Sequence, residues 1–451
     1  MRYTTYSTFG FSKEFNIPGK LTCQPVNLST RQPIPPIRNT NKHNILHTMK
    51  KTILFGSLLA VAACGITSCS DDPDPFEGDA VKLEYNAGNA RQWGNYMAHT
   101  ALLLKNDAET LYNQWATQYT KHENGQDVAQ GDSYANFFKN HDARTGYGDV
   151  DNCIQEMVEK MGEIANEVGS AKIGDPYQKW KDGDEDNAVL AVESWYSWHS
   201  RDDYTNNINS VRNAYYGTRD VYTADSVAPN SLAHAMSVAN PALDRKVRDC
   251  IWKAKDAIQA IVQPFRSHIG SDQTVVAMDA CEKLQKILGE IETDEEQKKG
   301  EATNLKEEAI KLDPATKQAI INNFVDNIVV PTYRELAEKN AALYNTVLAF
   351  QANPSNDAFE ACAQAWLAAR QPWETSEAFL FGPVDELGLD PNMDSWPLDA
   401  EGIKNILKSE KWADITQKGD DGNVTESAQN VRGFHTLEFL IFKDGKARTV
   451  K

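Results

Sequence analysis

The segment 433–442 carries the residue types most suited to chemistry. Its apolar residues recur every three or four positions, which predicts a largely buried helix. His435 and Glu438 stand one turn apart on this helix and project from the same side. An imidazole and a carboxylate at this spacing can share a metal ion or a proton, or they can form an ordinary hydrogen bond on a helix surface. The motif alone leaves these interpretations open.

A second segment, residues 193–198, embeds polar residues among aromatic ones. Glu193, Ser194 and Ser197 alternate there with Trp195, Tyr196 and Trp198. Polar groups in such surroundings need hydrogen-bond partners or water if they are buried. The segment is therefore either part of a polar site or an aromatic packing corner whose polar atoms face solvent.

Helices must position both segments, because apolar residues recur at helical intervals along most of the chain. One stripe runs over 330–348, with Pro331 near its start and Asn353-Pro354 as its stop. Other stripes run over 358–369, 208–215 and 247–261. No segment combines apolar–polar alternation with hairpin signals. The sequence predicts an all-α fold of two helical bundles.

The domain boundary is expected where composition changes. Residues 294–311 are dominated by Glu, Lys and Asp and hold almost no large apolar residue. We expect a first helical bundle over 81–300, a joining segment over 301–328 and a second bundle over 329–451.

The N-terminus resembles a secretion signal read from an internal start. Residues 1–48 show no apolar period and are interpreted as an extension that does not belong to the working protein. Met49-Lys50-Lys51 and an apolar run follow, as in a signal peptide over 49–68. A small residue precedes Cys69, so we expect lipidation of Cys69 and a flexible polar tether over 69–80. The chain would then be anchored to a membrane without spanning it.

Composition excludes some classes of protein. Hydrophobic residues make up 41% and charged residues 24% of the 451 positions, as in globular domains. The net charge of −18 disfavours nucleic acid as a partner. Cys153, Cys250, Cys281 and Cys362 lie far apart among apolar neighbours, which predicts buried reduced thiols rather than a thiolate metal site.

Several motifs in order resemble the imelysin family of bacterial envelope proteins. They are Pro331-Thr332-Tyr333, Ala365-Trp366, the run from Glu377 to Pro383, Trp396-Pro397 and the Gly-x-His-x-x-Glu motif from Gly433 to Glu438. The family's Glu-Ser-x-x-Ser signature matches Glu193 to Ser197, followed by Asn207, Arg212 and Tyr215-Tyr216-Gly217. Together these motifs cover most of the chain beyond the tether.

The order of the two signatures departs from the family's usual order, in which the Gly-x-His-x-x-Glu half comes first. Here Glu193 precedes His435, which looks like a circular permutation. Two similar bundles packed side by side tolerate such a change, because a linker need only join the old termini. The join is expected around residues 295–325.

The resemblance implies two four-helix bundles with a site between them, and either metal-dependent peptidase activity or a role in iron uptake. A common zinc peptidase needs His-Glu-x-x-His on a helix. His122-Glu123 is followed by Asn124-Gly125-Gln126, and Phe439 follows Glu438, so neither that motif nor its inverse is present. We therefore expect a lipid-anchored protein of a Gram-negative cell envelope that binds a metal ion, with a metallopeptidase as the alternative.

The resemblance also implies a set of site residues. His435 and Glu438 are expected to bind the ion directly, with Glu193 or Glu377 supplying a further carboxylate. Carboxylate and imidazole ligands without thiolate suit iron, manganese or calcium-like ions, and the family's association with iron uptake favours iron. Further residues of the same motifs are expected to orient these ligands, to hold an anionic ligand or to shape the site. They are Ser197, Arg370, Arg212, Asn207 and Gly433. Expected partners are a metal ion or metal complex, the outer membrane through the lipid, and an outer-membrane or periplasmic iron-transport system.

Overall fold

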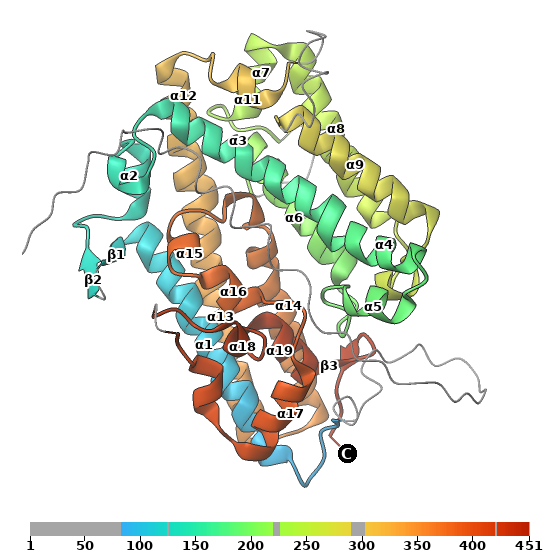
Figure 1. Ribbon diagram of the computed structural model, residues 1–451. Helices are drawn as coiled ribbons and strands as arrows, with labels where there is room; N and C mark the ends of the chain where they lie inside the picture. Colours follow the sequence, from blue (N-terminus) through green and yellow to red (C-terminus); the bar gives the residue numbers. More distant parts are fainter. Residues whose placement is uncertain (1–82, 124–125, 220–225, 290–302, 420–421, 451) are drawn as a thin grey trace, which may run out of the picture. The chain divides into compact units, whose positions relative to one another are not determined.

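The computed structural model describes residues 83–123, 126–219, 226–289, 303–419 and 422–450 (Figure 1). The expected signal peptide, the expected lipidation site Cys69 and the expected tether lie outside these ranges. These assignments therefore stay predictions. Residues 70–451 cluster as one compact unit. None of the described helices combines the length and apolar character needed to cross a lipid bilayer.

Helices dominate the described chain, as the apolar periodicity predicts. They are α1 (Ala90–Ala116), α2 (Tyr134–Lys139), α3 (Val150–Asn166), α4 (Gly174–Lys181), α5 (Glu185–Leu190), α6 (Ser200–Tyr216), α7 (Leu232–Ala239), α8 (Pro241–Gln259), α9 (Asp272–Leu288), α11 (Leu305–Ala309), α12 (Pro314–Phe324), α13 (Val330–Ala352), α14 (Asn356–Glu374), α15 (Pro383–Glu386), α16 (Leu389–Asp394), α17 (Ala400–Ser409), α18 (Glu426–Gln429) and α19 (Gly433–Ile441). The expected all-α fold class is confirmed.

Short helical turns and two small hairpins complete the described elements. The turns are η1 (Ala143–Thr145), η2 (Glu167–Lys172), η3 (Phe265–Ser267), η4 (Val325–Val329), η5 (Glu377–Phe379) and η6 (Trp412–Thr416). Strands β1 (Thr120–Glu123) and β2 (Gln126–Ala129) pair antiparallel, as do β3 (Phe442–Lys443) and β4 (Lys446–Ala447). The sequence interpretation missed both hairpins. Asp444-Gly445 between β3 and β4 is a recognised two-residue turn signal, with positive φ at both positions.

The helices form where side chains cap their first turns and apolar stripes face the core. In α3, Asp149 accepts a hydrogen bond from the Asn152 amide at the helix start. Buried residues of the same helix, among them Ile154, Met157 and Met161, then recur at three- and four-residue intervals. In α14, Ser355 caps the start, and Pro372 stands two residues before the last helical position.

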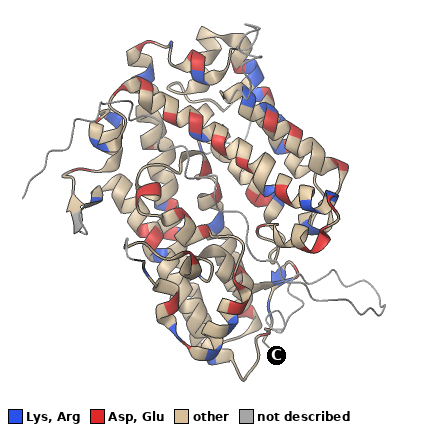
Figure 2. Cartoon of the chain, in the orientation of Figure 1, with Lys and Arg blue, Asp and Glu red and all other residues tan. Residues whose placement is uncertain are grey.

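Two groups of helices are visible in Figure 1. Helices α1, α13, α14 and α19 pack against one another, and α3, α6, α8 and α9 form the second group. The groups meet where α6 contacts α14 and where η5 contacts α3 and α6. The elements that carry the candidate site lie at this meeting point. Acidic and basic residues are distributed over the helices of both groups (Figure 2).

The packing of α1 differs from the expected domain boundary. Residues 81–300 were assigned to the first bundle, yet α1 packs along α13 and α19 of the second. The joining segment 301–328 contains α11 and α12 and buries Ile321 and Phe324. The charged run marks a change in composition, and composition does not determine which helices pack together. The domain limits and the permuted order stay predictions.

Candidate metal centre

Helix α19 lies in the interior, with each of its nine residues buried. It begins at Gly433, whose φ is +82°, and a Cβ at this position would overlap the carbonyl oxygen of Met393. Glycine thus allows the start of α19 to abut the end of α16. This contact brings His435 beside Asp394, the last residue of α16.

His435 lies between two carboxylates. Its Nδ1 is 3.1 Å from Glu438 Oε2, and its Nε2 is 3.2 Å from Asp394 Oδ1. The Trp396 ring packs edge-on against the imidazole, with 4.9 Å between ring centroids. Burial alone would lower the pKa of His435, but attraction to Asp394 outweighs it and raises the pKa to about 9. The imidazole is therefore protonated at neutral pH.

Glu438 is held by the second segment that the sequence singled out. Its Oε1 accepts hydrogen bonds from both the amide and the hydroxyl of Ser197, each at 2.8 Å. This segment is a turn, and it places Ser194 at φ +51° and Trp198 at φ +61°. Positive φ is costly for residues other than glycine, so surrounding contacts must hold the turn. One of them is the 2.6 Å hydrogen bond from the Ser194 hydroxyl to Asp203.

Arg370 lies at the centre of the charged network. It is almost fully buried and faces three carboxylates. Its Nη2 is 2.6 Å from Glu374 Oε1, its Nε is 3.4 Å from Asp203 Oδ2, and its Nη1 contacts Asp394 Oδ1. Asn207 donates to Glu374 Oε2 at 2.6 Å. Arg370 and Asn207 thus contact the carboxylates of this network, and their role as supporting residues stays a prediction.

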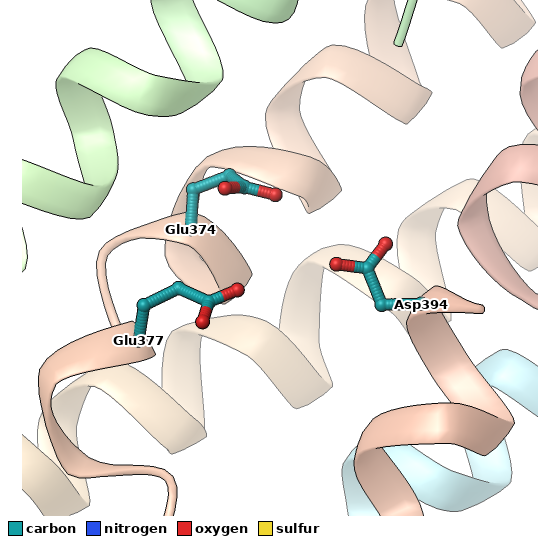
Figure 3. A group of neighbouring side chains, drawn as sticks. All are labelled: Glu374, Glu377 and Asp394. Atoms are coloured by element: carbon teal, nitrogen blue, oxygen red, sulfur yellow. The ribbon is translucent and has the colours of Figure 1, made fainter. Parts of the chain in front are cut away.

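Three carboxylates converge at one point of this network. Oxygen atoms of Glu374, Glu377 and Asp394 all lie within 4.8 Å of one another (Figure 3). Glu374 ends α14, Glu377 opens η5 three residues later, and Asp394 ends α16. Three oxygen donors from separate chain segments in a buried place form a fitting set for a hard cation. We call this group the carboxylate triad.

The pKa values of the triad carboxylates depend on how far nearby positive charges offset the effect of burial. Burial raises the pKa of Glu374 to about 8, and Arg370 only partly offsets this. Burial also raises the pKa of Glu377 well above its ordinary value, although Lys172 opposes the rise. Asp394 differs, because Arg370 and His435 outweigh burial and lower its pKa. A bound cation would supply the positive charge that Glu374 and Glu377 lack.

Glu193 lies on the far side of a buried lysine. Its Oε2 is 3.2 Å from Lys172 Nζ, which is also 3.9 Å from Glu377 Oε1. Burial alone would lower the pKa of Lys172, but Glu193 and Glu377 raise it well above its ordinary value. Glu193 thus reaches the triad only through Lys172, and no contact joins it to His435 in the described chain.

Arg212, another expected supporting residue, makes the following contacts in the structure. Its Nη1 donates to Asn213 Oδ1 and to the Thr218 carbonyl oxygen, both at 2.9 Å, and its guanidinium lies over the Tyr216 ring. None of these groups belongs to the charged network. Asn207 and Arg212 are five residues apart on α6, so their side chains point about 140° apart around the helix. Only Asn207 can therefore face Glu374.

Several residues of the network escaped sequence reasoning, namely Asp394, Glu374, Asp203 and Lys172. Only Glu374 carried a usable signal, because Arg370 and Glu374 stand four residues apart on a predicted helix. Asp394 is one of many isolated acidic residues, and nothing in its sequence neighbourhood shows that α16 ends beside His435.

The fold and the site define a class: an all-helical protein with a buried, carboxylate-rich centre where two helical groups meet. The Imelysin family model matches residues 71–291 and 329–451. This chain therefore belongs to the imelysin family. Residues 292–328, which lie between the two matched parts, are not matched and include the charged run.

A solved structure of similar sequence supports this membership. The crystal structure of an imelysin peptidase from Bacteroides ovatus, at 1.44 Å resolution, is 51% identical in sequence with a TM-score of 0.74. The match covers 83% of this chain and 100% of that chain. A putative iron-regulated protein A precursor from Parabacteroides distasonis ATCC 8503 is 41% identical over 40% of this chain and 50% of that one, with a TM-score of 0.37.

Iron-regulated protein A from Synechococcus elongatus is a curated relative. It is 36% identical over 130 residues, which are 28% of this chain and 33% of that protein. The chain thus spans about a third of the length of this relative.

Proposed function

We propose that this protein binds a metal ion, iron, through the carboxylate triad. The observation that carries the proposal is the convergence of Glu374, Glu377 and Asp394 within 4.8 Å in a buried, acid-rich network. Carboxylate oxygens without thiolate suit a hard cation, such as manganese, calcium or ferric iron. A curated relative named for iron regulation supports the choice of metal.

In this proposal His435 and Glu438 have a different role from the direct ligation first expected. Both imidazole nitrogens face carboxylates, and a protonated imidazole does not bind metal. His435 instead holds Asp394 in place, and Glu438 and Ser197 fix the orientation of His435. Direct ligation by His435 and Glu438 remains a prediction, which the same experiment tests.

We further propose a place for this binding. The signal-like segment and Cys69 support a lipid-anchored protein of a Gram-negative cell envelope, on the outer membrane and facing the surface or the periplasm. There it would bind iron or an iron complex during uptake and pass it to an outer-membrane or periplasmic transport system.

The test is metal titration of the chain from Ser70 to Lys451, which forms one compact unit. We expect one iron per chain by calorimetry and elemental analysis. Glu374→Gln and Asp394→Asn should each weaken binding by ~10-fold or more, because each removes one ligand charge. Glu360→Gln is the matched control, since Glu360 is exposed on the same helix as Glu374. Equal affinity in all four proteins would contradict the proposal.

His435→Gln separates the two roles of the imidazole. As a residue that holds Asp394, His435 should contribute less than Glu374 does, so binding should weaken less than in Glu374→Gln. A larger loss in His435→Gln than in either triad variant would favour direct ligation.

A second candidate function is metal-dependent peptide hydrolysis. The Bacteroides ovatus protein, 51% identical, is described as an imelysin peptidase. Incubation of unfolded casein with the metal-loaded chain tests this function. Cleavage that needs metal and disappears in both His435→Ala and Glu438→Ala would establish the peptidase, and we expect no such cleavage.

A further inference from the structure

A pocket of ≈ 470 Å³ lies beside the β3–β4 hairpin, apart from the carboxylate triad. Its lining includes Tyr85, Trp198, Lys446 and Arg448. We call it the hairpin pocket. Its volume falls in the range of small-molecule sites, and its lining mixes aromatic and charged residues as such sites do.

The hairpin pocket is locally basic in an acidic protein. Lys443, Lys446 and Arg448 line it together with only two acids, Glu84 and Asp444, whereas the whole chain carries −18. Lys443 is paired with Glu84 at 2.6 Å. Lys446 is exposed and makes no ion pair with any residue in the described ranges. The pocket therefore offers a cation to an anionic ligand.

Trp198, which lines the same pocket, carries an unused hydrogen-bond donor. Its indole Nε1 is shielded from solvent and has no hydrogen-bond partner among the described residues. Its ring lies against Gly445, where an added Cβ would be 2.5 Å from Trp198 Cδ2. A buried donor without an acceptor is costly, so a ligand oxygen at this place would remove a penalty.

The pocket is connected to the turn that holds Glu438. Trp198 directly follows Ser197, and the amide of Gly445 donates to the Tyr196 carbonyl oxygen at 2.9 Å. The hairpin and Trp198, the last residue of this turn, therefore line the pocket as connected parts.

We propose that the hairpin pocket binds a small organic anion that carries carboxylate groups. Its carboxylates face Lys446 and the Trp198 indole N–H, and its hydrocarbon part lies against the Trp198 ring. An anion can pair with the positive charge of the pocket and can accept a hydrogen bond from the indole N–H. The aromatic lining favours an organic anion over an inorganic one. This site is separate from the proposed metal centre, and neither requires the other.

Calorimetric titration of the metal-free chain from Ser70 to Lys451 tests the proposal, with phthalate, citrate and sulfate as probes. We expect phthalate and citrate to bind and sulfate to bind at least ~10-fold more weakly. Lys446→Glu should weaken phthalate binding by ~10-fold or more, because it reverses the unpaired charge. Lys408→Glu is the control, since Lys408 is also exposed but lies on α17.

Trp198→Phe tests the indole donor. It keeps an aromatic ring but removes the N–H, so phthalate binding should weaken several-fold while far-UV circular dichroism stays unchanged. The proposal is overturned if no probe binds, if sulfate binds as well as phthalate, or if the two lysine variants behave alike. A chain that binds iron but none of the anions would overturn only this inference. A chain that binds the anions but no iron would overturn only the metal proposal.

Discussion

Gly433 illustrates how a single residue sets the geometry of the centre. Its φ of +82° and the nearness of Met393 mean that alanine would meet both backbone strain and a steric overlap. We expect Gly433→Ala to lower the free energy of unfolding by about 3 kcal/mol, as the sum of a left-handed backbone and overpacking. Urea unfolding followed by circular dichroism measures this loss.

Gly388 is the matched control for Gly433. It has a φ of +58°, but a Cβ there would meet no atom within 4 Å. Gly388→Ala should therefore cost only the strain, about 1 kcal/mol. Equal losses in the two variants would show that the overlap with Met393 is not significant.

At this scale the sequence predicted one contact well and missed others. The three-residue spacing of His435 and Glu438 correctly predicted that their side chains meet. The same spacing does not show that Asp394 lies on the other side of the ring. Such a contact depends on where two helices end against each other, which local sequence does not encode.

The ion pair between Asp107 and Arg432 joins two elements, α1 and the start of α19. Burial raises the pKa of Asp107 to about 6, although Arg432 lowers it in part. The native state therefore holds this proton more tightly than the unfolded chain, whose value is 3.8. The stability contribution is complete below pH 3.8 and is lost as the pH rises through 6.

Asp107→Asn should remove this pH dependence. Between pH 4 and pH 7, the free energy of unfolding of the wild type should fall by about 2 kcal/mol more than that of the variant. Urea titrations of both proteins at several pH values measure the difference. Parallel pH profiles would contradict the raised pKa of Asp107.

The long helices could be predicted from sequence, and the irregular elements could not. Helix α13 spans Val330–Ala352, with Pro331 at its second position and the predicted stop at Asn353 directly after its end. Its apolar stripe and its terminal residues act locally, so the sequence contains the information. The turn over 193–198 has no such pattern, because contacts with Asp203 and Glu438 hold its positive φ angles.

The reactivity of the cysteine thiols measures how far the folded molecule as a whole buries them. Cys153, Cys281 and Cys362 are buried, and burial raises the pKa of each thiol to about 12. Cys250 is only half-buried, and burial raises the pKa of its thiol as well. In the chain from Ser70, we expect Ellman's reagent to react with one thiol per molecule at pH 8 and with three more only on unfolding.

Cys250→Ser identifies the reactive thiol. It should abolish the early phase and leave the three slow thiols unchanged. Four thiols that react together in the native wild type would contradict the buried positions.

The domain limits show what composition reveals about the whole chain. In the sequence, the charged run over 294–311 lies between the long apolar stripes. Composition could not reveal that α1 packs against α13, because that contact joins residues more than 200 positions apart.

The hydrogen bonds from Ser197 to Glu438 join residues 241 positions apart, and they bear on the timing of biogenesis. While a ribosome is still adding residues, Ser197 has no Glu438 to contact, and Asp394 has no His435. The centre therefore assembles only after the last helix has been made. We therefore expect a nascent or C-terminally truncated chain to lack the contacts that hold Asp394, so any loading of the proposed centre would follow the completion of synthesis.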